Sequence, residues 1–142
     1  MYKTILVLID ITEPELAKRV FPHINAIAST HDSRIHILTI IPSWPYHAFL
    51  ELGYYTGFVT EDILKAASDS LYNIIKNADV SGERLTTHVL MGSLRKNILE
   101  QVESLGADVI IVGSHILTSS FFCLGSRTGI ASHVACPVLI VN

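Results

Sequence analysis

The feature that most constrains the fold of this chain is a regular alternation of short apolar runs with helical patterns. Each apolar run is compatible with a β-strand, and the intervals between the runs repeat apolar residues at helical spacing. The predicted strands cover residues 3–9, 34–41, 84–90, 109–112 and 138–141. Strands that alternate with helices predict an α/β fold with an open, doubly wound parallel sheet.

Start and stop signals bound the helices between these strands. Thr12 and Glu15 have the spacing of a capping box, and Pro22, which lacks an N–H, is expected to kink the first helix. Gly106 is well placed to end a helix that begins after Gly92-Ser93. The two other helices are predicted from about residue 60 and from residue 126 to about residue 134.

The run 109–112 is apolar at every position, as expected of a strand in a parallel sheet that is covered on both faces. In such sheets, ligands bind beyond the carboxyl ends of the strands, at the topological switch point. Function is therefore expected at the residues that end the strands, which are Asp10, Ile40-Ile41, Met91-Gly92 and Gly113-Ser114.

Composition narrows the class of protein. The 142 residues suit a single domain over 1–142, and 49% hydrophobic with 16% charged residues, against about 25% charged in typical domains, excludes disorder. The net charge of −3 and the scattered Lys and Arg residues argue against a nucleic-acid partner and a membrane-binding helix. No apolar run approaches the ~20 residues of a membrane span, and the N-terminal run is short for a signal peptide, so we expect a cytoplasmic protein.

The segment 109–128 carries the clearest functional pattern. Gly113 ends a predicted strand, and Gly125-Ser126 opens a predicted helix. Glycine lets a backbone approach a phosphate closely, and a helix N-terminus offers free N–H groups to an anion. A glycine turn followed by a serine-capped helix is the alternative interpretation on spacing alone. Neither a Walker sequence nor a G-x-G-x-x-G fingerprint is present.

Five stretches carry a resemblance to a known family. They are KTILVLID at residues 3–10, LMGSLRKNILEQ at 90–101, ADVIIVGSH at 107–115, LGS at 124–126 and CPVLIVN at 136–142. With them, the chain resembles the universal stress protein family over its whole length and looks closest to the short enterobacterial-type members. The resemblance implies a Rossmann-like five-stranded parallel sheet of order 3-2-1-4-5 with helices on both faces. It also implies a homodimer and, in one branch of the family, an ATP site.

The resemblance further implies which residues would contact the nucleotide. Those bordering the adenine and the ribose would be Leu8, Asp10 and Ile40, and those closing the pocket floor would be Val112 and Gly113. Those facing the phosphates would be Gly125, Ser126, Arg127 and Thr128, with His115 nearby. The ATP-binding branch has the pattern G-x2-G-x9-G-[ST]. This chain has Ile116 at the middle glycine and a loop one residue shorter, where the backbone should approach the triphosphate.

Asp10 also has a physical argument of its own. A carboxylate at the end of a buried strand is costly unless it finds hydrogen-bond donors. Ribose hydroxyls would supply them, and so would neighbouring backbone N–H groups at a helix-entry turn, where Asp is common. The residue pattern leaves both interpretations open, and the family resemblance favours the ribose.

The histidines and serines do not predict a metal site or a hydrolase. No two histidines have the spacing of a helical zinc pair, so we expect no metal site built by the protein. A Mg²⁺ ion carried by ATP phosphates is compatible with this, because that ion needs few protein ligands. Ser126 lacks the G-x-S-x-G elbow, and no pattern supplies an evident general base. The histidines are at positions 23, 31, 36, 47, 88, 115 and 133.

Two segments raise the question of partners. Val138–Val141 is apolar, and pairing with the same strand of a second copy would remove an aggregation-prone sheet edge. The aromatic-rich stretch 42–58 is interpreted either as a flap that packs on its own domain or as a lid or partner surface.

The leading hypothesis is a small cytoplasmic homodimer with a regulatory or stress-response role. It binds ATP or a related adenine nucleotide, ADP or AMP, without rapid turnover. Two alternatives stay open. One is a dimeric protein-interaction module that binds no nucleotide, which Ile116 and the shortened loop favour. The other is a slow ATPase or phosphotransferase.

Overall fold

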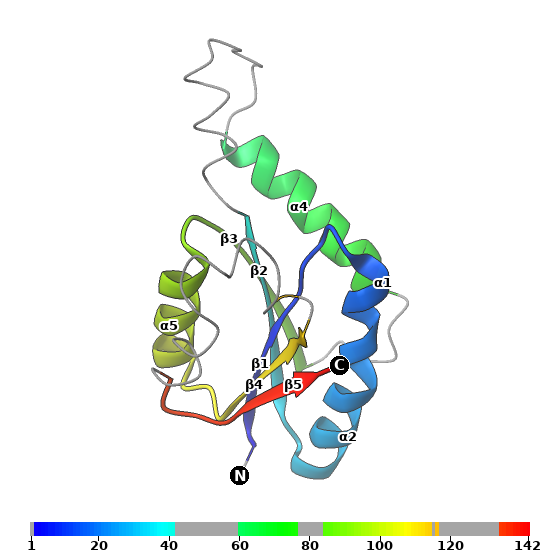
Figure 1. Cartoon of the computed structure of the whole chain (residues 1–142), viewed down its shortest axis with the longest axis vertical. Helices are drawn as coiled ribbons and strands as arrows, with labels where there is room; N and C mark the ends of the chain where they lie inside the picture. The colour runs from blue at the N-terminus through cyan, green and yellow to red at the C-terminus, as the bar shows by residue number, and fades with distance from the viewer. Residues whose placement is uncertain (1, 42–59, 77–83, 115, 117–133) are drawn as a thin grey trace.

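Five parallel strands form a sheet in the order β3-β2-β1-β4-β5, as Figure 1 shows. The computed structural model of the chain describes residues 2–41, 60–76, 84–114, 116 and 134–142. Each pair of neighbouring strands runs parallel. The fold class expected from the residue pattern and the strand order implied by the family resemblance are therefore confirmed. The strands are β1 (Thr4–Leu8), β2 (Arg34–Ile41), β3 (Leu85–Met91), β4 (Val109–Gly113) and β5 (Val138–Val141).

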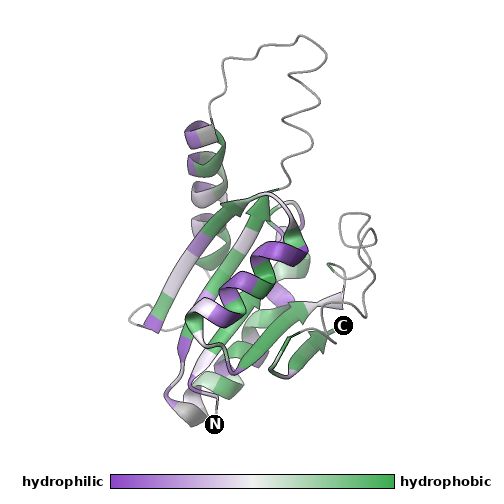
Figure 2. Ribbon diagram, turned by 90° about the vertical axis from the view of Figure 1, so that its left-hand side faces the viewer, coloured by the Kyte–Doolittle hydropathy of each residue, from purple (hydrophilic) through white to green (hydrophobic). Residues whose placement is uncertain are grey.

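Helices cover both faces of this sheet. They are α1 (Pro14–Ala17), the 3₁₀ turn η1 (Lys18–Val20), α2 (Phe21–His31), α4 (Thr60–Ile75) and α5 (Leu94–Leu105). In Figure 1, α1, α2 and α4 lie on one side of the sheet and α5 lies on the other. In Figure 2, α5 lies in front of the sheet with hydrophilic residues on its outer side, and the strands behind it are largely hydrophobic.

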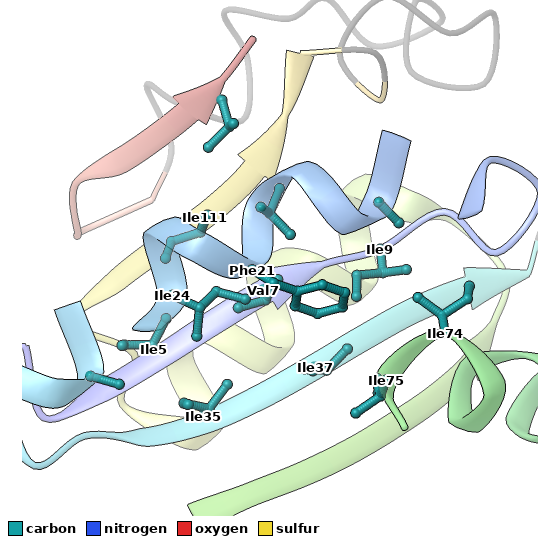
Figure 3. Packing of buried hydrophobic residues seen from close by; sticks show 14 of the residues in the cluster. Ile5, Val7, Ile9, Phe21, Ile24, Ile35, Ile37, Ile74, Ile75 and Ile111 are labelled. Atoms are coloured by element: carbon teal, nitrogen blue, oxygen red, sulfur yellow. The ribbon is translucent and has the colours of Figure 1, made fainter. Parts of the chain in front are cut away.

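Two apolar layers sandwich the central strands. The α2 layer, part of which Figure 3 shows, joins Ile5 and Val7 of β1 to residues of α2 and α4 such as Phe21 and Leu71. The α5 layer joins the alternate β1 residues to Ile98 and Val102 of α5. Because successive side chains of a strand point to opposite faces, a strand that packs in both layers must be apolar throughout. The α5 layer consists of Leu6, Leu8, Leu38, Ile40, Ile98, Val102, Ile110, Val112 and Ile116.

The expected effect of Pro22 appears as a 3₁₀ turn between α1 and α2. An α-helix continued through this point would need the N–H of residue 22 to donate to the carbonyl of Lys18, and proline has no N–H. The N–H of Phe21 donates to the Lys18 carbonyl instead, which is the tighter 3₁₀ bond. Pro22 then occupies the first turn of α2, where its missing N–H costs nothing.

The capping box expected at Thr12 and Glu15 is wrong. The N-cap of α1 is Glu13, and no side chain caps that helix. The helix begins one residue later than a box at Thr12 and Glu15 requires, and the Thr12 hydroxyl instead donates to Asp10 Oδ1 at 2.6 Å. By contrast, the signals around α5 are confirmed, with Ser93 accepting from the Lys96 N–H and Gly106 ending the helix at φ 65°.

A buried threonine holds the carboxyl end of β1 against β2. The Ile9 N–H donates to the Leu38 carbonyl at 3.0 Å, one residue beyond the end of β1. The Thr39 hydroxyl donates to the Ile9 carbonyl at 2.7 Å, and Thr39 is only 2% exposed. A side chain thus extends the contact between the two strands to the residue that precedes Asp10.

Two histidines meet on the α5 face where β2 pairs with β3. The His36 Nδ1 and His88 Nε2 atoms are 3.0 Å apart, a hydrogen bond in which one neutral ring donates to the other. Burial lowers the pKa of His36 below its usual value, and repulsion from His88 and then from Arg34 lowers it further. Burial and these two neighbouring groups therefore favour the neutral form of His36.

Several expectations fall outside the described residues. They include the aromatic stretch 42–58 and all of the helix expected at 126–134 except Val134. Among the helices of the described ranges, none is long and apolar enough to cross a membrane.

We predict that Thr39→Val lowers the free energy of unfolding by about 1–3 kcal/mol, because the buried Ile9 carbonyl loses its hydroxyl donor while side-chain shape is kept. Urea denaturation measures this. Thr39→Ser keeps the hydroxyl and loses only one methyl group, worth about 0.8 kcal/mol. A Thr39→Val protein as stable as the wild type would contradict the assignment.

We also predict that His36 makes the free energy of unfolding sensitive to acid. Since its folded-state pKa lies below the unfolded value of about 6.5, the unfolded chain binds this proton more readily. The stabilising contribution is complete above about pH 6.5 and is lost as pH falls below that value. His36→Gln should therefore show a smaller drop in urea midpoint between about pH 7.5 and pH 5.5 than the wild type. Equal drops in both proteins would refute it.

Candidate functional site

The candidate site lies where the chain reverses its direction of travel across the sheet. From β1 the chain builds outward through β2 to β3, and α5 then returns it to β4 on the other side of β1. The carboxyl ends of β1 and β4 therefore border a topological switch point, the place where open α/β sheets bind ligands. Leu8 and Val112 are register partners at this point.

Asp10 is oriented there by a local turn. Its Oδ1 atom accepts from the Thr12 N–H at 2.9 Å and from the Thr12 hydroxyl at 2.6 Å. Its main-chain carbonyl accepts from the Glu13 N–H at 3.2 Å. Both side-chain bonds go to one oxygen, and no group in the described part of the chain donates to Oδ2. The turn interpretation of Asp10 is thus correct for one oxygen, and the half-buried carboxylate keeps a second acceptor for a ligand hydroxyl.

The three apolar residues expected beside the adenine and the pocket floor lie in one layer. Leu8, Ile40 and Val112 all belong to the α5 layer, and Ile40, at 9% exposed, is the most accessible of the three. Ile116 packs in the same layer and is 6% exposed. The side chain that replaces the family's middle glycine is therefore turned into the apolar layer and not out into solvent.

The turn after β3 borders the same edge of the sheet. The Gly92 N–H donates to the Ile41 carbonyl at 2.9 Å. Gly92 has φ 123°, a backbone conformation that would be strained for any residue with a side chain. The Asn97 side chain donates to the Ser93 carbonyl at 2.8 Å and braces this turn. Sequence reasoning did not single out Asn97. Its position in the first turn of the helix predicted after Gly92-Ser93 was the available signal.

Some of the other candidate residues lie within the described ranges and others do not. Gly113 is buried at the end of β4, and the half-buried Ser114 follows it. Among the described residues that lie within two positions after a strand end at this edge, Asp10 is the one titratable side chain. The residues expected near the phosphates lie outside the described ranges: His115, Gly125, Ser126, Arg127 and Thr128.

Known proteins are similar to this chain over its whole length. A model of the universal stress protein family matches residues 1–142. Universal stress protein G of Escherichia coli O157:H7 is 32% identical over 146 residues, which covers 100% of both chains. The solved structure of hypothetical protein MJ0577 has a TM-score of 0.73 at 25% identity, covering 99% of this chain and 96% of that chain.

Two further solved structures are complexes with adenine nucleotides. A universal stress protein in complex with cAMP has a TM-score of 0.59 at 18% identity, covering 99% of this chain and 97% of that one. The universal stress protein from Archaeoglobus fulgidus in complex with dAMP has a TM-score of 0.62 at 18% identity, covering 99% and 98%. These two likenesses establish a shared fold. Because the family model and the full-length relative both span all of it, this chain belongs to the universal stress protein family.

Proposed function

We propose that this protein binds ATP or a related adenine nucleotide at the carboxyl ends of β1 and β4, as a cytoplasmic homodimer with a regulatory role in stress. The observation that carries the proposal is the carboxylate of Asp10, whose Oδ2 accepts no hydrogen bond from the described residues. Thr12 holds Oδ1, which orients Oδ2 for an outside donor. A vicinal pair of ribose hydroxyls is such a donor, and a charged acceptor makes these hydrogen bonds strong.

Different residues are proposed to contact the two ends of the nucleotide, with apolar residues at the adenine and polar groups at the phosphates. The adenine contacts the edge of the α5 layer at Leu8, Ile40 and Val112, where an apolar surface suits a flat ring. The phosphates are proposed to contact Gly113 and residues 125–128, whose sequence supplies two hydroxyls and the Arg127 guanidinium for an anion. His115 lies nearby in the sequence.

The relatives support the ligand class. Two members of the same fold were solved with cAMP and dAMP, which share an adenine, a sugar and one phosphate. The burial of Ile116 is compatible with the proposal, because its side chain packs in the α5 layer and is not exposed where a ligand would contact it.

We further propose binding without rapid turnover. Hydrolysis needs a base that activates water, and the proposed role of Asp10 commits both carboxylate oxygens to Thr12 and to the ribose. Mg²⁺ would accompany ATP through its phosphates and needs few protein ligands of its own.

We predict that Asp10→Ala weakens ATP binding about 10–100-fold, the loss expected for hydrogen bonds to a charged group worth about 1.5–3 kcal/mol. The same change should alter the affinity for 2′,3′-dideoxy-ATP much less, because that nucleotide lacks both ribose hydroxyls. Calorimetric titration of nucleotide-stripped protein measures both ligands.

Thr12→Val is the matched control for this experiment. It removes the hydroxyl that contacts Asp10 Oδ1 but keeps the carboxylate and the backbone N–H that holds the same oxygen, so ATP affinity should fall by much less than in Asp10→Ala. Absence of ATP binding at millimolar concentration would overturn the proposal. So would an Asp10→Ala loss that is equal for ATP and the dideoxy nucleotide.

The proposed homodimer uses β5, which forms one edge of the sheet. Ile140 of β5 is 47% exposed, and a bare apolar edge strand invites pairing with another strand. Two-fold symmetry would place the same strand of a second copy there.

We predict that Ile140→Lys shifts the protein from dimer to monomer in sedimentation velocity, because a charge at the edge opposes strand pairing. Ile140→Val should stay dimeric. Tyr72→Lys is the surface control: Tyr72 is 67% exposed on α4, away from β5, and its replacement should leave the dimer intact. A monomeric wild type, or a dimeric Ile140→Lys variant, would contradict the proposed interface.

A further inference from the structure

The histidine pair on the α5 face is separate from the proposed nucleotide site. His36 lies five residues before the end of β2, about 16 Å along the strand from the carboxyl edge of the sheet. His88 lies on β3, the edge strand beside β2. In the strand register, His36 is opposite Thr86 and His88 is opposite Leu38, so the two histidines are diagonal neighbours. The proposed function uses neither of them.

The backbone holds the two imidazoles together. β2 and β3 pair over seven consecutive register positions, and both histidines lie within that ladder. The ring centroids are 5.2 Å apart, the ring planes differ by 29°, and both side chains are half-buried. Strand pairing thus holds one nitrogen of each imidazole next to the other before any ligand arrives.

The separation of the two nitrogens matches a chelate. With metal–nitrogen bonds of about 2.0–2.1 Å, two imidazoles at neighbouring positions of a square-planar or octahedral ion have nitrogens about 2.9 Å apart, and about 3.3–3.4 Å apart around a tetrahedral ion. His36 Nδ1 and His88 Nε2 are 3.0 Å apart, between these values. To chelate an ion, each ring would turn its facing nitrogen away from the N···N line and toward a common point.

We propose that His36 and His88 form a two-histidine site for a late first-row divalent metal ion such as Cu²⁺, Ni²⁺ or Zn²⁺. One ring now donates its N–H to the other. On binding, that ring takes its other tautomer, so the hydrogen moves to the outer nitrogen and both facing nitrogens become ligands. The exchange involves no net loss of a proton from the neutral pair.

Water completes the coordination of the ion. Within the described residues, no group of three or more His, Cys, Asp or Glu side chains could hold a metal ion. His36 and His88 are therefore the two protein ligands that this part of the chain supplies. Imidazole ligands favour copper, nickel and zinc over magnesium and calcium, which prefer oxygen. Arg34 lies on the same strand and is exposed, so solvent screens the repulsion between its guanidinium and the metal ion.

Copper titration of tag-free, nucleotide-free protein tests this site, since Cu²⁺ binds such ligands most tightly in the divalent series. Calorimetry should detect Cu²⁺ binding that weakens roughly 10–100-fold in His36→Gln and in His88→Gln, because each variant loses one half of the chelate. The control is His23→Gln, which replaces an exposed histidine on α2 and should leave this binding unchanged. Mg²⁺ should not compete.

A second measurement does not depend on the variants folding. In the wild type, substoichiometric Cu²⁺ should broaden the imidazole proton resonances of His36 and His88 together, before those of His23. Copper affinity that is unaltered in both variants, or broadening that spares either ring of the pair, would overturn the proposal. Because nucleotide is absent throughout, failure here would leave the nucleotide proposal untouched.

Discussion

Burial of β1 and β4 between two apolar layers is the constraint on which the rest of this structure depends. Ile5 and Val7 of β1 enter the α2 layer, while Leu6 and Leu8 enter the α5 layer. Replacing such a residue by alanine typically costs about 2–5 kcal/mol, so these strands have little freedom to carry polar side chains. Chemistry is therefore displaced to the residues just beyond the strand ends, where Asp10 and Ser114 follow β1 and β4.

The same constraint explains how a single carboxylate can be both structural and functional. Thr39 extends the contact between β1 and β2 to Ile9, and the chain then turns at Asp10 toward α1. Thr12 satisfies one oxygen of that carboxylate, which offsets the cost of placing a charge at the end of a buried strand. A turn residue held in this way is already oriented for a ligand, so binding loses little side-chain entropy.

Much of the fold could be predicted from the sequence, because its elements follow local rules. Apolar runs placed β2 and β5 with the bounds that the structure has, and Pro22 marked the break between α1 and α2. The capping box failed because α1 begins at Pro14 with Glu13 as its N-cap, one residue later than the spacing of Thr12 and Glu15 implies, and residue spacing does not fix where the first turn closes.

Features that depend on contacts between distant residues could not be predicted in the same way. The apolar setting of Ile116 and the hydroxyl contact of Thr39 with Ile9 appear only once the strands are in register. His36 and His88 are 52 positions apart, and only the pairing of β2 with β3 brings their rings together. Spacing rules search along one element and miss a pair built across two strands.

A crystal structure of the protein with AMP bound tests the central claim most directly. The account expects a ribose hydroxyl within hydrogen-bond distance of Asp10 Oδ2, with Thr12 still bonded to Oδ1 and the adenine against Leu8 and Ile40. AMP bound elsewhere, or a ribose that makes no contact with Asp10, would contradict it.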